Sequence, residues 1–583
     1  MMSHSNSASA FLLLHLAEAE GAAELQRLDG ALLQAGWRRH DGMAGSRLYL
    51  SGKPELPVRR LGPSGVVIGR YYGRPTETVS LDGAATGRTL LREGWGGYVA
   101  LWQEGARLFG LRDPSGAIDL LTWSLGPVTV IASDLPADTN ALLPPGALIN
   151  WDHIARVLQY PAASCHGLGV SGLTSVAGGT LVTIVSGEPE LDPLWRPADF
   201  AGLNRKGDPE VLRRVVDGAV AWLASDHSDV VGEVSGGFDS AVVATAARIR
   251  ADEATIHWIN YHASERESDE GAYVDALCAK TSLMIERRFK PVRPLGLKDL
   301  EPLAKTLRPG LFGLDVDYDS DIARKMMESG ATAVLTGQGG DAVFFNSGTP
   351  ALVIDRLRRM GLAGLSPNFL YQTGRWTRRS VWSLVETALR DLFGIRQRRR
   401  TEDERPRSAG YEVHPWLADI ERLPPAKQDQ VRQLVNCQVF WSPCLRAAAG
   451  RMLHPLLSQP VMEQTLAIPT DVLTHGGQGR ALAKQAFKDR LPAILLARRG
   501  KGELTTFYGQ VVLESLPDLG SILMDGELMR RGLIDREETE ALLDPNVLIW
   551  SGDYNVVLIH SLMELWVRHW QGRVSALGQQ TSR

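Results

Sequence analysis

The stretch Val-Ser-Gly-Gly-Phe-Asp-Ser at residues 234–240 decides the fold of this chain. A short apolar run at 229–234 leads into it and predicts a buried strand, and the Ala-rich run 241–249 predicts a helix. Glycines between a strand and a helix let the backbone approach a ligand closely, and the first N–H groups of a helix have no partner within it. The stretch therefore predicts a phosphate-binding loop.

Five residues of this loop are candidates for ligand binding. Ser235, Gly236, Gly237 and Ser240 are expected to contact phosphate through hydroxyl and backbone N–H groups. Asp239 is unexpected beside phosphate unless a cation lies between them, and Mg²⁺ is held by one or two carboxylates together with phosphate oxygens. A glycine turn with a capping Asp explains the turn but not the whole Ser-Gly-Gly-x-Asp-Ser set. The loop lacks the Walker A pattern, and the chain has no G-x-S-x-G nucleophile elbow.

Predicted strands and helices alternate after this loop. Strands are expected at 255–261 and 333–336, and helices at 269–281 and 321–329. This alternation predicts a parallel α/β sheet. From residue 415 onward the pattern is mainly helical.

The region before the loop has a different sequence pattern. Residues 1–200 contain short apolar runs punctuated by Gly and Pro, which predict a largely antiparallel β region. Pro193, Pro197 and the polar stretch 204–209 mark a boundary between the two regions. The clearest of the apolar runs lie at 98–102, 107–111, 128–132 and 180–185.

A second glycine-rich stretch, Leu-Thr-Gly-Gln-Gly-Gly-Asp at residues 335–341, follows the predicted strand 333–336. On its own it could be a glycine turn capped by Asp. Together, the two stretches resemble the pyrophosphate-binding loop of ATP pyrophosphatases and the second loop of the asparagine synthetase family. The resemblance implies that ATP is bound, that Gly339 and Gly340 line its site, and that Asp341 is a Mg²⁺ ligand beside Asp239.

Further segments extend the resemblance over most of the chain. The family has an essential Lys in the segment that here reads Arg-Arg-Gly-Lys-Gly, residues 498–502. The resemblance implies that Lys501 stabilises negative charge at the reacting carbonyl and phosphate. Alone, this run, with Arg498 and Arg499 beside the Lys, would be a basic surface turn. The other matching segments are 267–270, 441–451 and 485–492, and in the N-terminal region 97–102, 109–116 and 176–195.

The resemblance implies an α/β protein of two domains. Residues 1–205 would form an Ntn-hydrolase-like αββα domain, a degenerate glutaminase. Residues 206–583 would form an ATP-pyrophosphatase domain, adenine nucleotide alpha hydrolase-like, with a helical end. Glutamine-dependent members begin with Met-Cys and use that Cys to hydrolyse glutamine. This chain begins Met1-Met2-Ser3 and has no Cys before Cys165, so the first domain is expected to be a scaffold.

A family member without glutaminase activity takes its amine from another source. The chain looks most like the lasso peptide cyclases, the isopeptide-forming macrolactam synthetases of the family. These are AMP-forming ligases that activate an Asp or Glu side chain of a precursor peptide and close a ring with its N-terminal amine. The implied substrate is a lasso precursor peptide, and the implied partners are a leader peptidase and a leader-binding protein.

Three alternatives remain open: an asparagine synthetase that uses free ammonia, a β-lactam synthetase-like ring closure of a small amino acid, and a scaffold without activity. Gln338 bears on the second, because β-lactam synthetases have a catalytic Tyr at the matching position. A Gln side chain is not a general base at neutral pH, so Gln338 is expected to orient the substrate.

Composition excludes several other classes. A net charge of −4 argues against nucleic acid as a partner, and four Cys without a CxxC pair exclude a disulfide scaffold and a zinc ribbon. The apolar run 10–16 has no basic residue before it, and no apolar stretch is long enough for a membrane span, so a cytoplasmic location is expected. The segment 345–415 is expected to be an insertion. Its basic part, 375–407, predicts a solvated loop or, alternatively, a docking surface for a peptide or protein.

Overall fold

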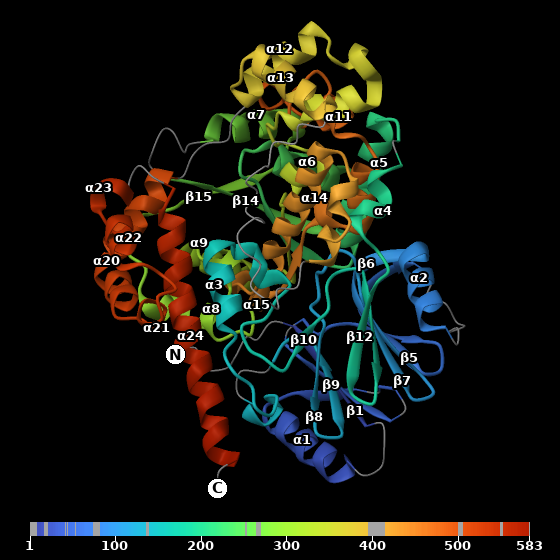
Figure 1. The fold of residues 1–583 in the computed structure, drawn as a ribbon, viewed down its shortest axis with the longest axis vertical. Helices are drawn as coiled ribbons and strands as arrows, with labels where there is room; N and C mark the ends of the chain where they lie inside the picture. The colour runs from blue at the N-terminus through green and yellow to red at the C-terminus, as the bar shows by residue number, and fades with distance from the viewer. Residues whose placement is uncertain are drawn as a thin grey trace.

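The computed structural model of the chain consists of an N-terminal part with two antiparallel sheets and a C-terminal part built around a parallel sheet (Figure 1). The antiparallel sheets have six strands each and the parallel sheet has five. The structure describes residues 9–16, 21–40, 42–43, 45–52, 54–73, 82–135, 139–203, 205–250, 254–263, 270–393, 414–498, 505–548 and 552–581.

The first antiparallel sheet contains the apolar run 10–16 as strand β1 (Ala10–Leu16), which pairs with β9 on one side and β3 on the other. Residues 11–15 are all buried because both faces of this strand are covered. Phe11 and Leu13 point toward the second sheet, while Leu12 and Leu14 pack with helix α1 (Ala22–Gln34). The other strands are β2 (Arg38–His40), β3 (Ser46–Ser51), β8 (Leu121–Leu125), β9 (Val128–Ala132) and β10 (Thr174–Ser175).

The second antiparallel sheet stacks on the first through a shared apolar core. Val66, Val99 and Val182 contribute to this core from three of its strands. Its outer face packs against helix α2 (Gly83–Glu93) through Leu90 and Leu91. The N-terminal part therefore has a helix–sheet–sheet–helix arrangement. The strands are β4 (Val58–Leu61), β5 (Gly65–Gly73), β6 (Gly94–Glu104), β7 (Arg107–Arg112), β11 (Thr180–Val185) and β12 (Glu188–Pro193).

The parallel sheet of the C-terminal part has the order β15-β14-β13-β16-β17. The chain proceeds from β13 through β14 to β15 on one side, then returns to place β16 on the other side of β13. The order in which strands are added to the sheet therefore reverses between β13 and β16. Ligands of open α/β sheets bind at such a reversal of strand order, beyond the carboxyl ends of the strands. The strands are β13 (Asp229–Glu233), β14 (Thr255–His262), β15 (Ile285–Phe289), β16 (Ala333–Leu335) and β17 (Arg451–Leu453).

Helices cover both faces of the parallel sheet. Helices α5 and α6 contribute to the core on one face, which includes Val230 and Leu335, and α9 covers the other through Ile322 and Met326. The helices of the first half are α3 (Trp151–Gln159), α4 (Pro197–Ala201), α5 (Pro209–Ser225), α6 (Phe238–Arg250), α7 (Gly271–Thr281), α8 (Leu297–Ala304), α9 (Val316–Ser329), α10 (Gly340–Val343), α11 (Ala351–Met360), α12 (Pro367–Thr377) and α13 (Val381–Leu392).

The remaining helices form most of the C-terminal end, where the long helix α24 runs down the side of the molecule (Figure 1). Trp566 and Trp570 of α24 are fully buried and donate to the carbonyl oxygen of Thr306. The helices are α14 (Pro425–Asn436), α15 (Leu445–Ala449), α16 (Gln459–Leu466), α17 (Thr470–Leu473), α18 (Ala481–Ala486), α19 (Ala493–Ala497), α20 (Thr505–Met524), α21 (Glu527–Arg530), α22 (Arg536–Leu542), α23 (Pro545–Leu548) and α24 (Tyr554–Thr581).

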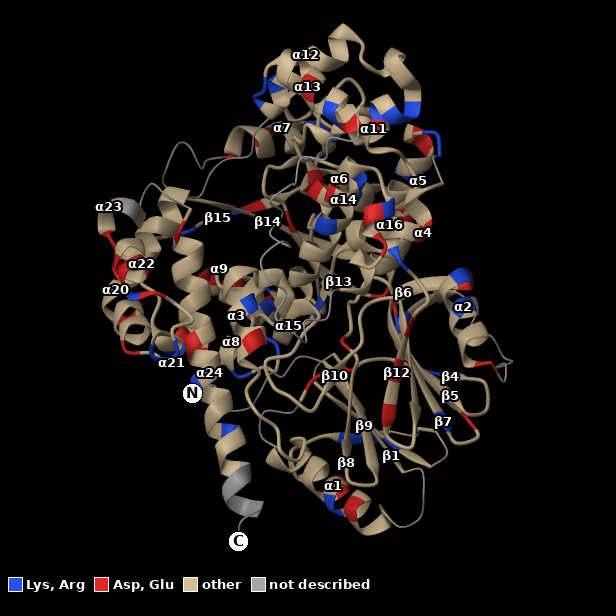
Figure 2. Ribbon diagram, viewed as in Figure 1, with Lys and Arg blue, Asp and Glu red and all other residues tan. Residues whose placement is uncertain are grey.

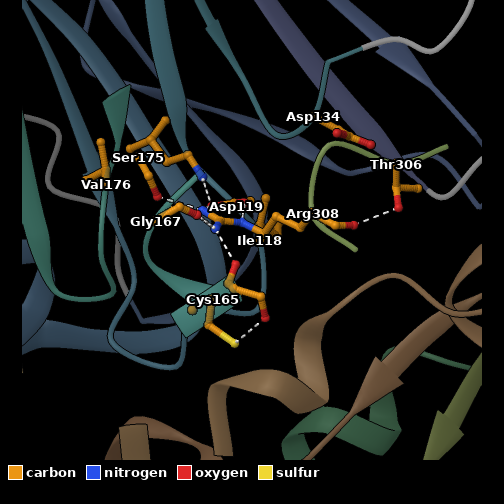
Figure 3. Close-up of polar contacts among 12 residues, drawn as sticks. Ile118, Asp119, Asp134, Cys165, Gly167, Ser175, Val176, Thr306 and Arg308 are labelled. Carbon is orange, nitrogen blue, oxygen red and sulfur yellow. Dashed lines mark hydrogen bonds and ion pairs between the residues drawn. The ribbon is translucent and has the colours of Figure 1, made fainter. Parts of the chain in front are cut away.

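Arg308 joins the two parts of the molecule (Figure 3). It lies after α8 in the C-terminal part, and its buried guanidinium pairs with Asp119 of the N-terminal part. It also donates to the carbonyl oxygens of Ser164 and Gly167 at 2.7 and 2.8 Å, and to the hydroxyl of Ser175 at 2.6 Å. A buried charge with this many partners holds the parts together in one orientation.

Most predicted elements are confirmed, including strands at 128–132 and 180–185 and helices ending at residues 281 and 329. The prediction of a solvated loop from residue 375 is wrong as far as residue 392, because α12 and α13 occupy that region. Residues 394–413 lie outside the described residues. Within the described part of the chain, every helix is too short or too polar to cross a membrane.

Candidate functional site

The two predicted loops meet at the reversal of the parallel sheet. The first connects β13 to α6, and the second connects β16 to α10. Because β13 and β16 are adjacent and parallel, their carboxyl ends place the two loops side by side. The structure thus brings together two stretches of sequence that are far apart along the chain.

Two glycines allow close packing around the first loop. A Cβ atom on Gly340 would lie 2.2 Å from Cγ of Asp239, so a side chain there would overlap the carboxylate of the first loop. Gly236 has a φ of +76°, and a Cβ there would lie 2.7 Å from Cβ of Glu270. Both positions therefore require glycine for packing reasons, independent of any ligand.

The serines of the first loop are organised by hydrogen bonds within the loop. The hydroxyl of Ser240 accepts from the backbone N–H of Ser235 at 3.2 Å and lies 3.3 Å from the Ser235 hydroxyl. The Ser235 hydroxyl in turn accepts from the N–H of Gly237 at 3.3 Å. Ser235 is exposed and Ser240 is buried, so Ser235 is the hydroxyl of the pair that solvent can reach.

The carboxylates of Asp239 and Asp341 converge on one guanidinium. Nη2 of Arg480 lies 2.6 Å from Oδ2 of Asp239 and 2.5 Å from Oδ1 of Asp341. Asp239 lies in the first turn of α6, Asp341 in α10, and Arg480 directly before α18. The backbone N–H of Arg480 donates to the carbonyl oxygen of Phe345 at 3.2 Å, which anchors the arginine beside the second loop.

This geometry fits a divalent cation. Two carboxylate oxygens within hydrogen-bonding distance of the same nitrogen are close enough together to coordinate one ion. Mg²⁺ needs only one or two protein carboxylates when phosphate oxygens complete its shell. Among the described residues, no group of three or more His, Cys, Asp or Glu side chains is arranged to hold a metal, so phosphate oxygens or waters would supply the remaining ligands.

A second ion pair borders the first loop. Arg498 pairs with Glu270 and donates to the carbonyl oxygen of Gly236 at 2.9 Å. Its guanidinium lies 4.2 Å from the ring centroid of Tyr273. Arg498 is therefore part of the structure of the loop. Lys501, three residues later in the sequence, lies outside the described residues, as do Arg499 and the 267–269 part of the 267–270 match.

Gln338 and Gly339 lie in the bend of the second loop. The backbone N–H of Gln338 donates to the Thr336 hydroxyl at 3.2 Å, and that hydroxyl lies 2.7 Å from Nδ1 of His454. Nε2 of His454 lies 3.2 Å from the carbonyl oxygen of Phe440, and burial lowers the pKa of His454 to about 3. A neutral ring that donates from Nε2 and accepts at Nδ1 satisfies both contacts. His454 thus supports the second loop through its contact with the Thr336 hydroxyl.

Arg446, from the segment 441–451, does not reach the two loops directly. It is buried between the rings of Phe312 and Tyr318, 4.7 and 4.9 Å from their centroids, and it pairs with Glu233 and Asp319. Burial alone would lower the pKa of Arg446, but these carboxylates raise it. Arg446 therefore has a structural role: it forms buried ion pairs at the carboxyl end of β13.

Comparison with known proteins identifies the family. The family model described as asparagine synthase matches residues 211–568, more than half of the chain, so the chain belongs to the asparagine synthase family. The chemistry of this family is ATP-dependent ligation. No curated protein matches the chain.

Two solved structures are similar to parts of the chain. One is glutamine phosphoribosylpyrophosphate amidotransferase from B. subtilis complexed with ADP and GMP. It has 12% identity and a TM-score of 0.18, over 43% of this chain and 59% of that one. The chain thus spans about three fifths of that structure's length. The other is the allosteric regulatory enzyme of purine biosynthesis, with 11% identity and a TM-score of 0.16, over 50% of this chain and 76% of that one.

Sequence reasoning missed Arg480. Its only local signal is its position at the end of a glycine-rich stretch, 476–480, shortly before the 485–492 match. Nothing in that pattern indicates a contact with Asp239 or Asp341. The contact follows from tertiary packing, because α18 packs against α5 and brings Arg480 to the two loops.

Proposed function

We propose that the chain is an AMP-forming amide ligase that binds ATP with Mg²⁺ across the two loops and closes a macrolactam in a lasso precursor peptide. The observation that carries the nucleotide site is the convergence of Asp239 and Asp341 on one cationic atom at the reversal of the parallel sheet. Membership of the asparagine synthase family supports the ligase chemistry.

The residues of the two loops have separate roles in this proposal. Ser235, Gly236, Gly237 and Ser240, together with Gly339 and Gly340, would contact the phosphates. Asp239 and Asp341 would hold Mg²⁺, which supplies positive charge opposite the phosphate oxygens. Arg480 already lies between the carboxylates, so it would turn toward a phosphate oxygen when the ion is bound.

The reaction proceeds in two steps. An Asp or Glu carboxylate oxygen of the peptide attacks the α-phosphorus of ATP, and pyrophosphate leaves. The N-terminal amine then attacks the acyl carbon, AMP leaves, and the amine loses a proton as the amide forms. Lys501 would stabilise the charge that develops at the carbonyl and phosphate, and Gln338 would orient the carboxylate by hydrogen bonding. Holding both peptide groups in place makes the second step effectively unimolecular.

The N-terminal part fits a degenerate glutaminase-like domain that serves as a scaffold. Its two stacked sheets with a helix on each outer side are consistent with an Ntn-hydrolase-like domain. The sequence has no Cys before Cys165, and burial raises the pKa of the Cys165 thiol to about 11, so that thiol is a poor nucleophile. A domain without glutaminase activity delivers no ammonia, which is consistent with an amine that comes from the peptide substrate itself.

The product of the reaction tests the proposal. The protein is incubated with Mg-ATP and either a linear precursor peptide with its leader peptidase, or free aspartate with ammonium. A peptide lighter by one water, with AMP formed in equal amount, supports the cyclase. Asparagine formation instead would assign the chain to the ammonia-using alternative. If no AMP forms with either substrate, the result would favour the scaffold without activity. An Asp239→Asn variant, assayed in parallel, excludes a contaminating ligase.

A further inference from the structure

Helix α13 carries apolar side chains on two opposite sides. Leu384 and Ala388 are buried against the core, as expected for a surface helix. On the other side, Trp382 is 82% exposed and Leu389 is 40% exposed, and Phe393, directly after the helix, is 72% exposed. Exposed large apolar side chains that lie together mark an interaction surface, and among the described residues no element covers this outer side of α13.

Exposed arginines lie at the end of helix α12 and in the short turn that leads into α13, close in sequence to Trp382. Tyr371, Arg375 and Arg378 follow one another at helical spacing and are all exposed, and the Arg375 guanidinium lies 5.7 Å from the Tyr371 ring centroid. The two helices are close, because a Cβ on Gly374 would lie 2.8 Å from the carbonyl oxygen of Arg379 and 3.7 Å from Cδ1 of Leu384. We call the exposed side of this helical hairpin the α12–α13 face.

The arginines of this face lack acidic partners among the described residues. Arg358 and Arg390, on the neighbouring parts of α11 and α13, pair with Asp391 and Glu386 respectively. Arg375, Arg378 and Arg379 form no ion pair within that part of the chain. The whole protein has a net charge of −4, so this local excess of positive charge is not a general property of its surface.

We propose that the α12–α13 face is the docking surface for a protein partner that presents an apolar helix edged by carboxylates. The apolar side of α13 would cover the partner's apolar residues, and the arginines between α12 and α13 would pair with its acidic residues. Figure 2 shows basic residues on these helices at the top of the molecule, away from the N-terminal sheets.

Two other occupants fit less well. A second copy of this chain packed by two-fold symmetry would bring Arg375, Arg378 and Arg379 against the same arginines. A lipid surface would meet Glu386, which lies between Trp382 and Leu389 along the helix and is exposed. A carboxylate there is repelled by anionic headgroups and is costly to bury in hydrocarbon.

Binding of a designed probe tests the docking surface. The probe is a fluorescent amphipathic helical peptide of about 18 residues, with Leu on one face and Glu on the other. A matched peptide has Lys in place of Glu. Anisotropy is measured on the full chain without ATP, so the result does not depend on the proposed function. Two variants are compared: Trp382→Gln with Phe393→Gln, and Arg375→Glu with Arg378→Glu and Arg379→Glu.

Matched controls change the same residue types elsewhere. Trp222 and Leu203, which are 56% and 51% exposed, are both changed to Gln, and the exposed Arg92, Arg422 and Arg530 are changed to Glu. Thermal unfolding verifies that each variant is folded. We expect the Glu peptide to bind the unchanged protein and both controls equally, and each face variant at least about tenfold more weakly.

Several results would overturn the proposal. They are absence of binding by the Glu peptide, equal binding of the Lys peptide, and equal weakening in the control variants. Sedimentation with vesicles of phosphatidylserine and phosphatidylcholine that requires Trp382 and Phe393 would assign the face to lipid. Concentration-dependent dimerisation that the same variant abolishes would assign it to a second copy.

Discussion

Nη2 of Arg480 lies 2.6 Å from Oδ2 of Asp239, although Asp239 lies in α6 and Arg480 directly before α18, on a distant segment of the chain. The same nitrogen contacts Asp341, so one arginine bridges the two carboxylates that we propose as metal ligands. A cation and this arginine cannot occupy the same position between the carboxylates. Binding of Mg²⁺ with nucleotide should therefore be coupled to a movement of the Arg480 side chain.

Replacing Arg480 should lower the stability of the ligand-free protein but strengthen its binding of Mg²⁺. In Arg480→Met, Asp239 and Asp341 face each other without a cation, and we expect the free energy of unfolding to fall by about 1–2 kcal/mol. Adding Mg²⁺ without ATP should restore more stability to this variant than to the unchanged protein. Urea unfolding with and without Mg²⁺ measures both effects. Equal Mg²⁺ effects in the two proteins would show that the ion binds elsewhere.

Removing either proposed metal ligand should abolish nucleotide chemistry. Asp239→Asn and Asp341→Asn keep the shape of the side chain but not its charge, so we expect ATP–pyrophosphate exchange to fall at least about 100-fold. Circular dichroism checks that the fold is retained. Asp275→Asn is the matched control, because Asp275 is exposed and pairs with Arg287 away from the two loops. Full activity in either loop variant would refute the metal assignment.

The buried pair of Arg308 and Asp119 should hold the N-terminal part in place. Arg308→Met leaves the Asp119 carboxylate buried with Arg112, 2.9 Å away, as its remaining cationic partner beside the N–H of Leu120. We expect a loss of about 3 kcal/mol in the free energy of unfolding. Hydrogen exchange should increase in residues 164–176, which contact Arg308. In a double variant with Asp119→Asn, the loss should be smaller than the sum of the two single losses, and simple additivity would contradict the pairing.

Mild acid should destabilise the protein through buried neutral histidines. Burial lowers the pKa of His454 to about 3, and His153 and His166 are lowered to about 3 and about 4, with burial as the largest cause. In the unfolded chain these rings take up protons below about pH 6.5, whereas in the folded chain they stay neutral. Stability is therefore lost as the pH falls from about 6.5 toward 4, by about 1.4 kcal/mol per pH unit for each ring.

His454→Gln tests the contribution of one ring. A Gln side chain can still accept from Thr336 and donate to the Phe440 carbonyl oxygen, but it does not titrate. The dependence of the urea midpoint on pH between 6.5 and 5 should be shallower in this variant. His475→Gln, at an exposed position, is the control and should keep the original dependence. An unchanged dependence in His454→Gln would show that other groups dominate.

Local patterns predict a helix or strand well where the residues of that element alone show its period and its ends. Strand β9 and strand β11 begin and end where their apolar runs do. The first glycine-rich stretch lies between a strand and a helix as predicted, and the second follows a strand as predicted. Strand β17 was missed, because its three residues are too short to show a period. Helices α12 and α13 were missed because their exposed arginines were interpreted as a loop, whereas their buried residues repeat at helical spacing.

Local sequence was enough to predict the two glycine-rich loops with their aspartates and the resemblance to the asparagine synthetase family, because adjacent residues create the turn after each strand. Three other features appear only in the folded chain: Asp239 and Asp341 share Arg480, Arg308 contacts Asp119, and α13 exposes an apolar side. These contacts join residues that are distant along the chain. They depend on the order of strands in the sheet and on the packing of helices around it, which no local spacing encodes.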